Sequence, residues 1–310
     1  MRHAQPALAH RRSFWQNAYR SRYLYLMIAL PIAYFILFKY VPMAGISIAF
    51  QDYKIYKGFL GSKWVGLKHF EKYLTDPDFW VLVRNTLHLS FLSIVICFPL
   101  PIIFALFVNE LESKRFKALV QNVSYVPHFI SVVVVVSVLT LFVSKTGPVN
   151  DLIAALGGER KSFMMDKNWF RPLYIITDLW KDTGWNAIIY LAALAGVDMQ
   201  IYESARIDGA NRFQQLLHIT IPGIMNTIVV MFILRMGSVL SIAFEKVLLM
   251  QNPVTYETSD VISTYVYRRG LSGMQFSYAA AVDLFSSVIN LILLVLTNSF
   301  SRRFSETSLW

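Results

Sequence analysis

Residue types that carry out covalent chemistry are sparse in this sequence. Within the predicted spans, Asp178 and Asp182 form the one acid pair that a helix would place on a single face, where two carboxylates could share general acid–base work. There is no phosphate-binding G-x-x-x-x-G-K-S/T loop, no H-E-x-x-H zinc motif and no G-x-S-x-G nucleophile turn. Cys97 has no partner, and the six histidines lack ligand spacing. The sequence therefore predicts no catalytic site, no metal and no cofactor.

A polar segment at 203–222 (ESARIDGANRFQQLLHITIP) has a stronger pattern. Gly209 predicts a break between two helices, and Pro222 predicts the end of the second. Phe213, Leu216 and Leu217 recur at helical spacing and give the second helix an apolar stripe among polar residues. A helix of this kind lies on a membrane surface or docks in a groove of a partner protein.

The elements that position this segment must be membrane helices. The chain of 310 residues is 55% hydrophobic and only 15% charged, whereas a soluble domain is about 25% charged. This apolar content excludes disordered and nucleic-acid-binding tails, so no nucleic acid is expected as a partner. Six spans are predicted, with five as the alternative because the fourth carries Asp178, Lys181 and Asp182. The predicted spans are 23–50, 87–108, 123–143, 173–197, 224–244 and 278–300, and several contain prolines that predict kinks (Pro31, Pro42, Pro99, Pro101 and Pro127).

Positive charge before the first span predicts the orientation of the chain. With the N-terminal segment included, the two faces carry nearly equal numbers of Lys and Arg, 12 inside and 11 outside, so these counts barely discriminate. The prediction rests on the N-terminal run itself: Arg2, Arg11, Arg12, Arg20 and Arg22, with no acid. We expect an N-terminal cytoplasmic segment at 1–22, a multi-pass domain at 23–300 that contains a cytoplasmic loop at 198–223, and a cytoplasmic tail at 301–310.

The loop resembles the cytoplasmic Glu-Ala-Ala loop of permease subunits in binding-protein-dependent ABC importers. Glu203, Ala205, Gly209, Ile219 and Pro222 stand at the spacings of that family, while Ser204 and Ile221 depart from its usual Ala and Leu. Asp208 and Ala210 complete the D-G-A of the sugar branch. Three further segments resemble the carbohydrate permeases: 64–70 (WVGLKHF), 180–185 (WKDTGW) and 190–194 (YLAAL). Two more resemble the branch that imports complex polysaccharide fragments, including alginate and pectic oligosaccharides: 244–253 (FEKVLLMQNP) and 260–268 (DVISTYVYR).

The resemblance implies an all-α permease with six transmembrane helices in the bacterial inner membrane, both termini being cytoplasmic. It implies that the loop couples to an ATPase through Glu203, Ser204, Ala205, Asp208, Gly209, Ala210 and Pro222. The implied partners are a second homologous permease, two copies of a cytoplasmic ATPase, an extracytoplasmic solute-binding protein and membrane lipid. The implied function is ATP-driven import of oligosaccharides by alternating access, with no chemistry in this chain.

Candidates for the substrate pathway are aromatic and charged residues within or near the spans, since sugars bind aromatic faces and hydrogen-bonding side chains. These candidates are Trp180, Trp185, Tyr190, Arg235, Tyr265 and Asp283. Charge inside a membrane span is costly, so each charged residue needs a partner or a role. We expect an Arg235–Asp283 ion pair, or substrate contact as the alternative. We also expect a local Asp178–Lys181 pair and a Lys246 that snorkels to the interface.

Arg235 and a slightly cationic outer face favour an acidic oligosaccharide such as an alginate fragment as the substrate. A neutral sugar is the first alternative. A secondary transporter, which would follow an ion gradient, and a membrane enzyme that uses Asp178 and Asp182 are weaker alternatives.

Overall fold

A computed structural model describes residues 21–241 and 244–304, so four of the N-terminal arginines and residues 305–310 of the expected tail lie outside the described residues. The described chain is helical apart from one short antiparallel pair of strands, β1 and β2, in which Gln51 faces Trp64. Its α-helices and strands are α2 (Arg22–Phe35), α3 (Val41–Met43), β1 (Gln51–Asp52), α4 (Gly58–Gly61), β2 (Lys63–Trp64), α5 (Lys68–Leu74), α6 (Phe79–Leu92), α7 (Pro99–Asn109), α8 (Lys114–Tyr125), α9 (Val132–Phe142), α10 (Pro148–Ala155), α11 (Phe170–Ala195), α12 (Met199–Ile207), α13 (Arg212–Gln215), α14 (Ile221–Met236), α15 (Phe244–Met250), α16 (Tyr256–Ser259), α17 (Ile262–Tyr267) and α18 (Phe276–Phe304).

Short π- or 3₁₀-helical turns join several of these helices into longer rods. Four rods within the described residues are long and apolar enough to cross a membrane: Arg22–Phe50, Phe79–Asn109, Arg212–Met236 and Phe276–Arg302. The expected third span is not one straight helix, because Lys114–Phe129 and Val132–Phe142 meet at 100°. The bend follows Pro127, and Ser131 caps the new helix by accepting a hydrogen bond from the backbone N–H of Val134.

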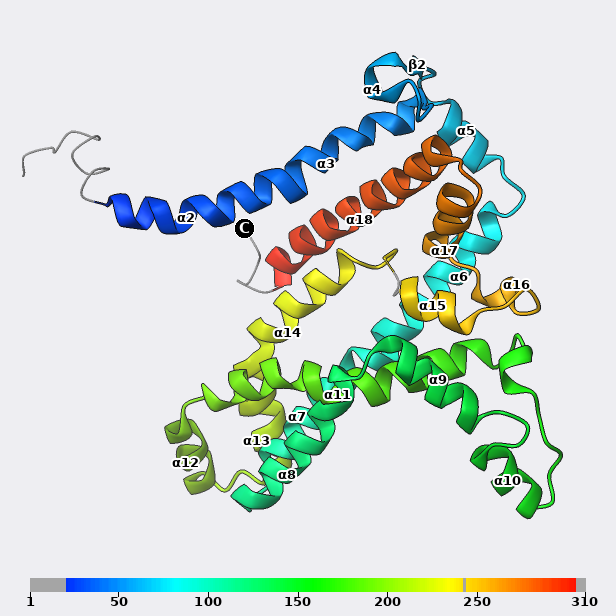
Figure 1. The fold of residues 1–310 in the computed structure, drawn as a ribbon. Helices are drawn as coiled ribbons and strands as arrows, with labels where there is room; N and C mark the ends of the chain where they lie inside the picture. Colours follow the sequence, from blue (N-terminus) through cyan, green and yellow to red (C-terminus); the bar gives the residue numbers. More distant parts are fainter. Residues whose placement is uncertain (1–20, 242–243, 305–310) are drawn as a thin grey trace, which may run out of the picture.

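Helix α11 occupies the expected fourth span and lies at the centre of the fold. Its 26 residues make a helix of about 39 Å, longer than a hydrocarbon core of about 30 Å. Because it carries charged residues, α11 is less apolar than the helices that could cross a membrane facing lipid. It packs against α7, α8, α9, α14 and α15 (Figure 1). A charged helix tolerates this position because its neighbours, and not lipid, surround its polar side chains.

The polar loop after α11 and the connection between α3 and α6 lie at opposite ends of the molecule. Figure 1 shows α12 and α13 at one end and β2, α4 and α5 at the other. Helix α8 approaches α11 very closely at Gly184, where an added Cβ would lie 2.2 Å from the carbonyl oxygen of Ser124. The fold thus holds the ends of α11 and the loop that follows it in a fixed relation to the rest of the chain.

Candidate functional site

The loop after α11 has the predicted helix–break–helix form. Asp198 caps α12 by accepting a hydrogen bond from the Gln200 backbone N–H at 2.9 Å. Gly209 then adopts φ of +79°, a conformation that glycine reaches without strain. Asn211 and Gln214 form a reciprocal capping box at the start of α13, with N···O distances of 2.8 and 2.9 Å. These local bonds fix the break and the start of α13 within the loop itself.

The predicted coupling residues lie on the outer surface of this loop. Glu203, Ser204, Asp208 and Gly209 are exposed, while Ala205 and Ala210 are partly buried. The expected apolar stripe also faces outward: Phe213 is 65% exposed, and Ile207 of the preceding helix is 86% exposed. Gln215, in contrast, points inward and donates to the Ala210 carbonyl at 2.8 Å. Apolar side chains left uncovered on a folded loop are typical of a surface that contacts a protein partner or a membrane.

The predicted helix end at Pro222 is wrong. Arg212–Met236 is one continuous rod, in which a π-helical turn at Leu216–Thr220 precedes α14. Pro222 is exposed and lies in the first turn of α14, where a missing backbone N–H is tolerated. The loop therefore leads directly into a membrane-length helix, so a displacement of α13 is carried into α14.

Next to the loop, a hollow of about 850 Å³ opens between α12, α13 and the connection from α7 to α8. Arg212 spans it, with its guanidinium nitrogens 3.7 Å from a carboxylate oxygen of Glu110 and 3.6 Å from one of Glu112. All three side chains are exposed, so these ion pairs add little to stability. They do connect the loop to the end of α7.

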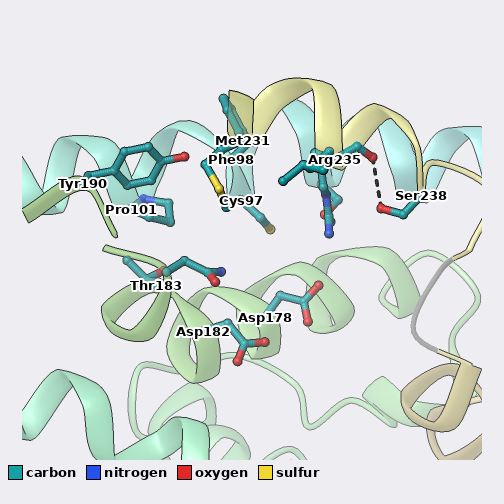
Figure 2. Close-up of a pocket in the computed structure, with 13 residues that line it drawn as sticks. Cys97, Phe98, Pro101, Asp178, Asp182, Thr183, Tyr190, Met231, Arg235 and Ser238 are labelled. Atoms are coloured by element: carbon teal, nitrogen blue, oxygen red, sulfur yellow. Dashed lines mark hydrogen bonds between the residues drawn. The ribbon is translucent and has the colours of Figure 1, made fainter. Parts of the chain in front are cut away.

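A second cavity, of about 280 Å³, lies between α7, α11 and α14. Figure 2 shows Arg235 on one wall and, across from it, helix α11 with Asp178 and Asp182. Two of the six predicted pathway residues, Tyr190 and Arg235, line this cavity. The full lining is Ser93, Cys97, Phe98, Pro101, Asp178, Asp182, Thr183, Asn186, Tyr190, Met231, Leu234, Arg235 and Ser238.

The spacing along α11 holds a signal that the sequence reasoning missed. Asp178, Asp182, Asn186 and Tyr190 recur every four residues, which places a polar row along one face of a helix. All four line the cavity. A polar row on a buried helix is the pattern of a wet interior surface, and it would have added Asn186 to the predicted site.

The expected Arg235–Asp283 ion pair is not formed. The Arg235 guanidinium donates to the hydroxyl of Ser93 on the facing helix. Asp283 is exposed on α18 and does not line the cavity. The two residues lie on different faces of the fold, which their positions in the sequence cannot reveal. Arg235 is consequently left facing the cavity without a carboxylate within 4.0 Å among the described residues.

Lys246 does not snorkel to an interface, and Asp178 does not pair with Lys181. Lys246 is buried, with 3% of its side chain exposed, and donates to the carboxylate of Asp178. It also donates to the Tyr174 carbonyl at 2.9 Å, and its ammonium lies 3.4 Å from the centre of the Tyr174 ring. Lys181 turns instead toward the His128 carbonyl. Burial of an ammonium at this depth requires such a set of partners.

The remaining predicted aromatic residues lie outside the cavity. Trp185 stacks on His128, and Trp180 is 52% exposed on α11. Tyr265 is fully buried near the β-strand end, where its hydroxyl donates to Asp76 at 2.7 Å and lies 3.0 Å from the hydroxyl of Tyr278. In this structure Tyr265 contacts other side chains of the fold rather than the cavity.

Comparison with known proteins agrees with this geometry. Residues 98–306 match the family described as "Binding-protein-dependent transport system inner membrane component". The chain is 48% identical over 292 residues to the polygalacturonan/rhamnogalacturonan transport system permease protein YteP of Bacillus subtilis, covering 94% of this chain and 91% of that protein. It is 44% identical to Protein LplB of the same organism, covering 94% and 92%.

Solved structures show the same architecture. One is a bacterial ABC transporter involved in the import of the acidic polysaccharide alginate, with a TM-score of 0.87, 39% identity, and coverage of 94% of this chain and 99% of that chain. Another is a bacterial alginate ABC transporter in complex with an alginate pentasaccharide-bound periplasmic protein, with a TM-score of 0.88 at 39% identity, covering 96% and 99%.

Proposed function

Because the chain belongs to the family of binding-protein-dependent transport system inner membrane components and is the non-catalytic permease of a carbohydrate ABC importer, we propose that its cargo is an oligosaccharide that carries uronate carboxylates. Relatives named for two different polymers support this proposal. One transports polygalacturonan or rhamnogalacturonan, and the other imports the acidic polysaccharide alginate. Polygalacturonan and alginate share sugar rings that bear a carboxylate, so the shared chemistry is the acid group.

The observation that carries the proposal is the position of Arg235. Its guanidinium lines the cavity and donates to Ser93, a neutral hydroxyl, so it retains donors for a ligand. A guanidinium binds a carboxylate through two parallel N–H···O bonds, which are among the stronger hydrogen bonds in proteins. Thr183, Asn186 and Tyr190 add neutral hydrogen-bonding groups that suit sugar hydroxyls.

The test compares uronate oligomers with neutral oligomers of equal length. We expect uronate oligomers to stimulate ATP hydrolysis by the reconstituted transporter, and Arg235→Gln to reduce that stimulation roughly tenfold, as expected for loss of a charged hydrogen-bonding partner. Stimulation of the wild type by neutral oligomers alone would overturn the proposal. Unchanged uronate transport by Arg235→Gln would leave the substrate class standing and remove Arg235 from the site.

A neutral sugar is the second candidate, and one observation favours it. The cavity wall formed by α11 carries two carboxylates, Asp178 and Asp182, which oppose the approach of an anion. Their effect depends on how well each is neutralised by its own partner.

We also propose the assembly and orientation of the transporter. The complex would contain a second permease, two ATPase copies and a solute-binding protein, with α12 seated on an ATPase. ATP closure would then switch the two permeases between inward-open and outward-open states. The exposed Ile207 and Phe213 support this docking. Both termini would be cytoplasmic, and reporters fused after residues 65, 115, 155, 210 and 265 should lie alternately outside and inside. An external residue 210 would exclude contact with a cytoplasmic ATPase.

A further inference from the structure

Two neighbouring cavities meet at a boundary that holds one cation and one anion. The larger cavity has a volume of about 280 Å³ and the smaller one about 130 Å³. Four residues line both: Ser93, Asp178, Arg235 and Ser238. Asp178 and Arg235 therefore face the same space from different helices, and each is a natural partner for the other.

Asp178 nevertheless pairs with a different cation. Lys246 on α15 donates to its carboxylate, although Lys246 lines neither cavity. Tyr174 and Asp178 are one turn apart on α11 and thus share a face, and Lys246 contacts both. The ammonium is held from behind the cavity wall by the carboxylate, a backbone carbonyl and an aromatic ring.

The other charged groups near this boundary have partners of their own. Asp182 accepts from His128, with 2.8 Å between Nδ1 and Oδ1. Lys181 is directed to the His128 carbonyl. Among the described residues that line both cavities, Arg235 is the cation, and its guanidinium donates to the neutral hydroxyl of Ser93.

We propose that Lys246 is a positioning residue for anionic cargo, which acts by holding Asp178 away from Arg235. This inference rests on the proposed function. With Lys246 present, the charge of Asp178 is neutralised and the guanidinium remains available for a substrate carboxylate. Without Lys246, the carboxylate of Asp178 takes the place of the substrate anion at Arg235. Selectivity for charge is then set by a residue that never touches the sugar.

The experiment measures the ratio of ATPase stimulation by uronate and by neutral oligomers, using the full transporter in liposomes with its binding protein. Lys246→Gln should lower this ratio roughly tenfold, the effect of losing Arg235 as a charged hydrogen-bonding partner for the substrate carboxylate. Lys246→Arg should retain the ratio because it keeps the charge. Asp178→Asn should retain or raise it.

The double variant Asp178→Asn/Lys246→Gln separates charge from structure. It removes both charges, so the ratio should return to within about threefold of the wild-type value. Such a recovery would show that the effects of the two substitutions are not additive and that the two residues are coupled. Lys114→Gln, which removes an exposed cation on α8, should leave the ratio unchanged. Co-purification of the partner subunits reports whether each variant assembles.

Failure of the proposed function and failure of this inference give different results. If the wild type shows no preference for uronate, the proposed function fails. If the wild type prefers uronate but assembled Lys246→Gln keeps the full preference, or the double variant stays as low as Lys246→Gln, this inference is wrong and the proposed function stands.

Discussion

His128 lies flat against Trp185: the two rings are parallel, and their centroids are 4.4 Å apart. The same imidazole places Nδ1 2.8 Å from Oδ1 of Asp182, three residues before Trp185 on α11. His128 itself belongs to the turn that precedes the 100° bend between α8 and α9. The bend of the third span is thus attached to α11 by a stacked ring and a polar bond.

Replacement of His128 should loosen this attachment. His128→Ala removes both interactions, and we expect the free energy of unfolding to fall by about 1–2 kcal/mol. This value is at the lower end of the usual range for a ring pair and a hydrogen bond, because the side chains of His128 and Asp182 are each about one-third exposed. His128→Phe keeps the ring and should lose less. Thermal midpoints of the purified transporter in detergent measure the difference. Equal midpoints for His128→Ala and the wild type would show that the stack does not hold the bend.

The loop after α11 should be required for coupling but not for insertion. Glu203→Lys reverses an exposed charge on α12, and Gly209→Pro forces φ to about −65° where the chain has +79°. Both variants should reach the membrane and lose stimulation of ATP hydrolysis by loaded binding protein. Gly157→Pro is the matched control, since Gly157 has φ of +81° in a loop at the far side of the fold. Full stimulation in both loop variants would exclude this loop as the coupling element.

A single added methyl group at Gly184 should force α8 and α11 apart. Its Cβ would lie 2.2 Å from a backbone oxygen of Ser124, which cannot rotate away. Overpacking of this kind costs about 1–3 kcal/mol or more, so Gly184→Ala should lower the yield and thermal midpoint of the transporter. Gly196→Ala, at the end of the same helix, has its nearest contact at 3.4 Å and should behave like the wild type. Similar yields and midpoints for the two variants would contradict the close approach.

Asp76 should make the β-strand end of the molecule sensitive to acid. Burial opposes its charge, but hydrogen bonds from Tyr265, the backbone N–H of Asp78 and Tyr278 outweigh burial and hold the pKa of Asp76 below its ordinary value. A carboxyl whose pKa is lowered by folding stabilises the fold above its unfolded pKa of about 3.9 and loses that contribution as pH falls through the lower folded pKa. Thermal midpoints from pH 7 to pH 3 should fall more steeply for the wild type than for Asp76→Asn. Parallel curves would show that this carboxylate does not link stability to pH.

Local patterns were sufficient to predict the membrane class and the helix–break–helix form of the polar loop. The six expected spans were recovered only in part: four rods of the described chain are long and apolar enough to cross a membrane, or five if the bent pair counts as one span. Long apolar runs identify spans because no other element satisfies the backbone in lipid. The break at Gly209 and the capping residues around it act within a few residues, so their outcome is set by the nearby sequence. The prediction that the helix ends at Pro222 failed because a π-helical turn precedes this residue and lets the helix continue without the backbone N–H that proline lacks. Residue types alone do not specify such a turn.

Partners of charged side chains could not be predicted because they come from distant segments. Lys246 and Asp178 are 68 residues apart in the sequence, and Arg235 and Ser93 are 142 apart. Spacing along one helix suggested Lys181 as the partner of Asp178, but packing of α15 against α11 brings Lys246 closer. Only the three-dimensional path of the chain decides which of several cations reaches a given carboxylate.

Helix α2 has no such long-range buried packing with the rest of the described chain. No residue of α2 (Arg22–Phe35) is buried by the rest of the described chain, although the rod that it begins is apolar enough to cross a membrane. A mutation there disturbs no buried packing within the described chain, so the fold of the subunit selects for hydrophobicity and length more than for particular residues. Over evolutionary time α2 should therefore diverge faster than α11, and deep mutational scanning should find it tolerant of apolar exchanges and intolerant of charge.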